Sequence, residues 1–128
     1  MSTNTLNRPV LAAACLFALT ALIHAFVGGP EINAPVQSSG LDPVVRAVSA
    51  VVWHALTALF LILAAGLAWA ARHSNPALIW VTLALNLAFV AIFLTLGFIA
   101  LGNAVEMPQW TLFVATSLCL LAGLRRKT

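Results

Sequence analysis

Hydrophobic and polar positions alternate along this chain in long blocks. Four apolar stretches, at about residues 9–28, 44–71, 77–101 and 108–124, are separated by short polar segments. A transmembrane helix needs about 20 predominantly apolar residues, so each stretch is long enough to cross a bilayer, the last one only just. The pattern predicts one domain of the all-α integral membrane class, a four-helix transmembrane bundle.

Glycine, proline and polar residues indicate where these helices begin and end. The Gly-Gly-Pro sequence at 28–30 is expected to end the first helix, because proline cannot continue the hydrogen-bond ladder. Glu31 would then lie on an irregular exit that leads into a polar loop. Asp42 is expected to cap the second helix and Pro43 to open it. A polar turn at 72–76 makes the second and third helices antiparallel neighbours.

The composition indicates a membrane protein and argues against two classes of function, nucleic-acid binding and thiol-disulfide exchange. Hydrophobic residues make up 62% and charged residues 7%, against about 45–50% and 25% in soluble domains. Three of the six basic residues directly follow the last apolar stretch, so they indicate membrane anchoring and not nucleic-acid binding. Cys15 and Cys119 lie inside apolar stretches without a CxxC spacing, which argues against thiol-disulfide exchange.

The basic residues also predict an orientation. Those expected on one side are Arg8, Arg72, Arg125, Arg126 and Lys127, and only Arg46 lies near the other. Positive residues concentrate on the cytoplasmic side, so both termini are expected there. The longer loops would face the periplasm of a bacterial inner membrane. The first stretch is too long for a secretory signal and lacks an A-x-A cleavage site, so it is expected to stay as a helix.

Candidate metal ligands gather in the outward half of the protein. His24 and His54 each belong to a polar face of adjacent helices, and such faces turn inward because ionisable side chains are costly against lipid. Every acidic residue, including Glu31 and Glu106, is expected on the same side. Two imidazoles and a carboxylate suit Zn, Fe or Cu(II). We therefore predict a periplasm-facing metal site with ligands His24, His54 and Glu31, and Glu106 as the fourth candidate.

Other polar and aromatic residues are expected around this site. They are Thr20, Thr57, Asn86, Trp53 and Arg46. Both threonines lie about one turn inward of a histidine, where they would orient the imidazoles. A different hypothesis is a b-type haem with His24 and His54 as axial ligands, although Trp53 would crowd a porphyrin.

A third hypothesis needs no cofactor. The chain contains no GxSxG, P-loop or HExxH motif, and it identifies no reaction, so whether it is an enzyme stays open. An accessory subunit or a small-solute carrier could use an outward polar pocket, with His24 and His54 as hydrogen-bonding or pH-sensitive groups. Because so small a bundle exposes much of its surface to the lipid bilayer, we expect a homo-oligomer or a subunit of a larger membrane complex.

Two segments resemble a known pattern. HAFVGGPEI at 24–32 and VVWHALT at 51–57 are similar to segments of uncharacterised short four-helix inner-membrane proteins of proteobacteria. The two segments lie within residues 24–57, about a quarter of the chain, and the resemblance implies the same fold and location, without an activity. A role shared by the matching positions would involve His24, Gly28, Gly29, Glu31, Trp53 and His54.

Overall fold

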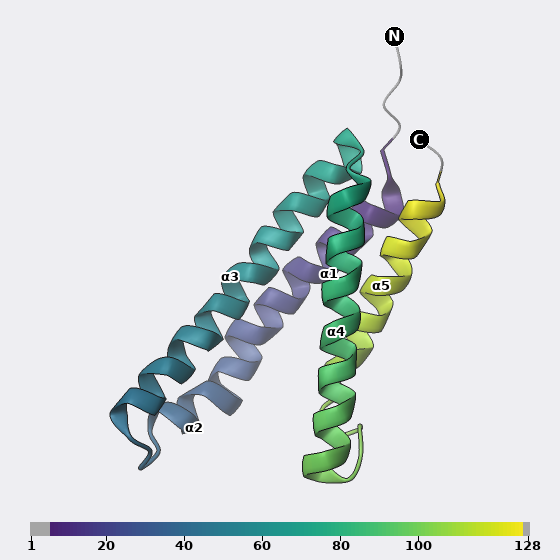
Figure 1. Cartoon of the computed structure of the whole chain (residues 1–128). Helices are drawn as coiled ribbons and strands as arrows, with labels where there is room; N and C mark the ends of the chain where they lie inside the picture. The colour runs from purple at the N-terminus through teal and green to yellow at the C-terminus, as the bar shows by residue number, and fades with distance from the viewer. Residues whose placement is uncertain (1–5, 127–128) are drawn as a thin grey trace.

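The structure is a computed structural model that describes residues 6–126. Its elements are α1 (Arg8–Ile23), the π-helical segment η1 (His24–Asn33), α2 (Ala34–Gln37), α3 (Pro43–His73), α4 (Pro76–Leu101) and α5 (Trp110–Arg125). The first three of these elements form one continuous helix, so residues 6–126 fold into four helices (Figure 1). The prediction of an all-α membrane bundle is confirmed.

The Gly-Gly-Pro sequence at 28–30 lies inside the first helix, and the prediction that it ends this helix is wrong. The helix continues for 30 residues, from Arg8 to Gln37. In η1 the hydrogen bonds reach five residues back, as from the Ala34 N–H to the Gly29 carbonyl. A π turn is wider than an α turn, so Pro30 removes one hydrogen bond without breaking the helix. Glu31 therefore lies on a helix and not on an irregular exit.

The other helix ends follow the local sequence signals. The side chain of Asp42 accepts a hydrogen bond from the backbone two residues on, and Pro43 is the first residue of α3, as predicted. Asn75 caps α4 in the same manner, ahead of Pro76. Gly102 ends α4 in the left-handed region, at φ 71°, which glycine adopts without strain.

Three of the four helices are long and apolar enough to cross a membrane, namely Arg8–Gln37, α3 and α4. The fourth, α5, is a shorter apolar helix of 16 residues, about 24 Å long. The starts of α1 and α4 and the ends of α3 and α5 lie at one end of the bundle (Figure 1). Arg8, Arg72 and Arg125 therefore lie at the same end, which we call the closed end.

Asn7 joins three helices at the closed end. Its backbone N–H donates to the Ala71 carbonyl over 2.9 Å, and its Nδ2 donates to the Gly123 carbonyl over 3.0 Å. Its Oδ1 accepts a hydrogen bond from the Val10 N–H and so caps α1. A Cβ on Gly123 would overlap Val10, so the close approach of α5 to α1 requires glycine at this position.

The helices diverge away from the closed end. The closest packing joins α1 to α3, α4 to α5 and α1 to α5. Contacts between α3 and α4 include Gly66 against Leu78 and Phe60 against Phe89, both in the C-terminal part of α3. Beyond them the chain separates into two arms (Figure 1). The first arm consists of η1, α2 and the N-terminal half of α3, and the second consists of the C-terminal half of α4 with its loop to α5.

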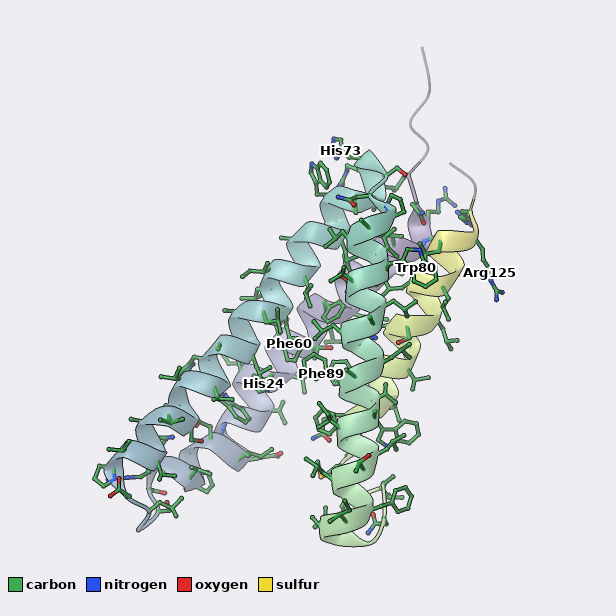
Figure 2. All side chains as sticks on the ribbon, viewed as in Figure 1. His24, Phe60, His73, Trp80, Phe89 and Arg125 are labelled. Atoms are coloured by element: carbon green, nitrogen blue, oxygen red, sulfur yellow. The ribbon has the colours of Figure 1, made fainter. Side chains whose placement is uncertain are left out.

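An aromatic cluster holds the helices together where the arms separate. Phe60 of α3 is 4% exposed. Its ring centroid lies 6.2 Å from that of Phe17 on α1, 5.9 Å from that of Phe89 on α4 and 6.0 Å from that of Phe113 on α5. Figure 2 shows Phe60 and Phe89 facing each other between their helices. All four helices therefore meet at Phe60.

Candidate functional site

His24 is the first residue of η1 and packs against α3. Its ring stacks on that of Trp53, with centroids 4.0 Å apart and planes at 17°. The edge of the ring also meets Phe60, with centroids 5.7 Å apart at 88° (Figure 2). His24 Nε2 lies 3.1 Å from the Trp53 carbonyl oxygen. Because a carbonyl only accepts, Nε2 donates in this contact, and in the neutral ring Nδ1 then carries the lone pair.

Gly28 allows Trp53 to lie against η1. A Cβ at Gly28 would come within 3.1 Å of Trp53 Cη2 and 3.2 Å of Cζ2. A side chain at Gly28 would therefore require the indole ring to shift by at least a few tenths of an ångström. His24, Gly28 and Trp53 therefore form one packing unit between η1 and α3.

His54 lies on a different side of α3. It is exposed and makes no hydrogen bond or ring contact within residues 6–126. One residue in an α-helix corresponds to a rotation of about 100°, so the packing of Trp53 toward η1 turns His54 away from it. The two imidazoles, which the sequence places on facing polar stripes, do not face one another in this fold.

The two predicted carboxylate ligands lie on different arms. Glu31 is exposed on η1. Glu106 is exposed in the loop after α4, where its Oε1 accepts a hydrogen bond from Asn103 Nδ2 over 3.3 Å. Residues 6–126 contain no group of three or more His, Cys, Asp or Glu side chains arranged to hold a metal ion. The metal site and the haem site therefore stay predictions from the sequence.

The threonines predicted near the histidines form hydrogen bonds within their own helices. Thr20 Oγ1 donates to the Leu16 carbonyl over 2.8 Å, and Thr57 Oγ1 donates to the Trp53 carbonyl over 3.2 Å. In membrane helices this is the usual way to satisfy a hydroxyl.

Arg46 and Gln37 hydrogen-bond to each other at the end of the first arm. Arg46 Nη1 donates to the Gln37 carbonyl over 2.9 Å, and Gln37 Nε2 donates to the Arg46 carbonyl over 3.1 Å. This reciprocal pair joins α2 to α3 across the short loop at 38–42. Sequence analysis did not identify Gln37, although a glutamine next to a polar loop and nine residues before an arginine is a usable signal.

Asn86 is fully buried and joins α4 to α5. Its Nδ2 donates to the Phe113 carbonyl and to Ser117 Oγ, and the second of these bonds measures 2.9 Å. The Oδ1 atom of Asn86 is buried without a partner in the described part of the chain. The inward position of Asn86 agrees with its polarity, but its partners lie on α5 and not beside the histidines.

No protein-family model, curated protein or solved structure matches the chain. Its function has therefore to be inferred from its own residues. Among the predicted site residues, His24, Trp53, Arg46 and Asn86 make specific contacts within the chain. His54, in contrast, is an ionisable side chain that lies exposed on a membrane helix.

Proposed function

We propose that the protein is a non-enzymatic subunit of a membrane assembly. In this proposal the exposed face of α3 binds a neighbouring transmembrane helix. The observation that carries the proposal is the exposure of His54 in a segment that is otherwise apolar.

The depth of His54 supports this proposal. α3 has 31 residues and is about 46 Å long, which exceeds the hydrocarbon thickness of about 30 Å. His54 lies about 17 Å along α3 from Pro43, so in a centred helix it is about 9 Å inside the hydrocarbon. An imidazole that faces lipid at this depth is costly, and a partner helix removes this cost by offering a hydrogen bond.

The low burial of α3 also supports the proposal. In the most apolar window of each helix, 11% of residues are buried in α3, compared with 33% in Arg8–Gln37 and 22% in α4. The helix with the exposed histidine is therefore also the one with the most surface left for a partner.

The proposal includes a location in the bacterial inner membrane with both termini in the cytoplasm. The arginines at the closed end support this orientation, since positive residues concentrate on the cytoplasmic side. Single cysteines at positions 35–40 and 103–105 should react with an impermeant maleimide added to the periplasm, and those at 73–75 should not. The reverse labelling pattern would contradict the orientation.

Affinity purification of tagged protein from native membranes tests the assembly. We expect a stoichiometric partner, either a second copy or another membrane protein, to be retained by the wild type and lost from His54→Ala. His73→Ala is the matched control, because His73 is also exposed but lies at the end of α3. A partner retained equally by all three forms, or no partner at all, would refute the proposal.

A metal centre is the second candidate function. Three groups favour this candidate. The His54 imidazole and the Glu31 carboxylate have no hydrogen-bond partner within residues 6–126, and His24 uses only Nε2 in its contact with α3, which leaves Nδ1 available to a metal. Zn, Fe and Cu suit this set of ligands. Elemental analysis of the wild type and of a His24→Ala, His54→Ala double variant tests this candidate. Metal bound only by the wild type would support it, a Soret band would identify the metal group as haem, and equal metal content would exclude it.

A further inference from the structure

One straight stripe of exposed residues runs along α3. It consists of Ala47, Val51, His54, Ala58, Leu61 and Ala65, which are all exposed. We call this set the His54 stripe. Its spacing alternates between four and three residues, an average of 3.6, which is the repeat of the α-helix, so the stripe stays on one face of α3.

The His54 stripe lies opposite the face that α3 packs on the bundle. Ala58, Leu61 and Ala65 each precede by two residues a buried residue of α3, namely Phe60, Leu63 and Leu67. Two residues correspond to a rotation of about 200°, so the stripe faces away from the core. Figure 1 accordingly shows α3 at the edge of the bundle.

We propose that the His54 stripe binds a second copy of this chain in a parallel dimer, with the two His54 side chains facing each other across a two-fold axis. This inference rests on the proposed function and names the partner at the same face. The axis runs along the membrane normal, so that both copies keep the same orientation in the membrane.

The symmetry explains why a second copy satisfies His54. A two-fold axis along the membrane normal places the same residue of both copies at the same depth. A neutral imidazole carries one N–H donor and one bare nitrogen acceptor. Two facing His54 rings therefore hydrogen-bond to each other, whereas lipid or an apolar helix would leave both nitrogens without a partner.

The rest of the stripe is compatible with close contact between two copies. Ala47, Ala58 and Ala65 let the backbones approach, as small residues do at other transmembrane interfaces. No Asp, Glu, Lys or Arg occurs between residues 47 and 71, so no like charges meet within this part of α3. His54 lies near the middle of the stripe, where its hydrogen bond is shielded from water.

Disulfide cross-linking in native membranes tests the register of the dimer. Single cysteines at 47, 58 and 65, which leave His54 in place, should form covalent homodimers on oxidation in a Cys15→Ala, Cys119→Ala background. Val52→Cys and Ile62→Cys are matched controls, because both positions are exposed on α3 outside the stripe. We expect about tenfold less dimer from the controls, since a disulfide requires Cα atoms within about 7 Å.

The contribution of the paired His54 side chains is tested separately, by measuring how strongly the dimer associates in His54 variants. By Förster transfer between labelled copies in vesicles, His54→Leu should raise the dimer dissociation constant about tenfold, as loss of one hydrogen bond worth about 1.4 kcal/mol would. His54→Asn should stay near the wild type, because a carboxamide also carries donor and acceptor. His73→Leu should have no effect. A dimer unaffected by His54→Leu would overturn the inference.

The outcomes separate this inference from the proposed function. Cross-links from the stripe to a different protein, without homodimer, would overturn the inference and keep the proposed function. Equal cross-linking at stripe and control positions would indicate random collision and would also overturn it. Absence of any product, together with no partner in the affinity purification, would refute both.

Discussion

Replacement of Phe60 by alanine should loosen the point at which all four helices meet. The Phe60 ring contacts Phe17, His24, Phe89 and Phe113, which belong to α1, η1, α4 and α5. The change removes all four ring contacts and leaves a void. In water-soluble cores Phe→Ala costs roughly 3–5 kcal/mol.

The expected loss is at the low end of this range. Lipid tails are as apolar as the protein core, so the part due to transfer from water is reduced in a membrane. Each aromatic contact contributes about 0.5–1.5 kcal/mol, and the four contacts of Phe60 share one ring, so they do not add fully. We expect Phe60→Ala to lower the free energy of unfolding by about 3 kcal/mol and Phe60→Leu, which refills most of the volume, by about 1.5 kcal/mol.

The measurement is reversible unfolding by sodium dodecyl sulfate in mixed micelles, followed by tryptophan fluorescence. Phe98→Ala is the control. Phe98 is a phenylalanine of the neighbouring helix α4 but is 58% exposed, so its replacement should cost less than about 0.5 kcal/mol. Spin labels at positions 36 and 104, one on each arm, should report a broader distance distribution in Phe60→Ala. Equal destabilisation by Phe60→Ala and Phe98→Ala would refute the role of the aromatic cluster.

Three further substitutions test other contacts in the same unfolding assay. Gly28→Val should push Trp53 away from η1 and cost about 1–3 kcal/mol, whereas Gly29→Val should cost clearly less because a Cβ there meets nothing within 4 Å; equal losses would contradict the packing. Asn86→Leu should lower the free energy of unfolding by about 1 kcal/mol, since it removes two interhelical hydrogen bonds worth about 0.6 kcal/mol each. A variant more stable than the wild type would contradict this, and would show that the cost of burying the unpaired Oδ1 exceeds the gain from the two hydrogen bonds. Gly123→Ala should cost about 1–3 kcal/mol by forcing α5 away from α1, and an unchanged stability would disprove this close approach.

The sequence by itself determined the class of fold, the number of helices and most of their ends. Apolar blocks of about 20 residues predict membrane helices, because length and hydrophobicity are what a bilayer requires. Asp42 predicts a helix start, because capping depends on backbone groups within one turn. These properties are local, so they can be identified without knowledge of the partners of a helix.

The Gly-Gly-Pro sequence at 28–30 shows where local reasoning fails. Glycine costs a helix about 1 kcal/mol and proline about 3 kcal/mol, which predicts an end. Packing of Trp53 on Gly28 and the reciprocal bonds between Gln37 and Arg46 hold η1 and α2 against α3. Contacts between distant residues thus outweigh the local preference, and the helix continues in π form.

Only the tertiary structure decided which way each helix faces. Periodicity places His24 and His54 on polar stripes, but it does not tell which neighbour a stripe meets. The stacking of Trp53 on His24 set the rotation of α3 and left the next residue, His54, exposed. Likewise Asn86 had to be buried, yet its partners on α5 follow from the rotation of both helices. The rotation of a helix is the result of all its contacts with other helices, and these join residues that are far apart in the sequence.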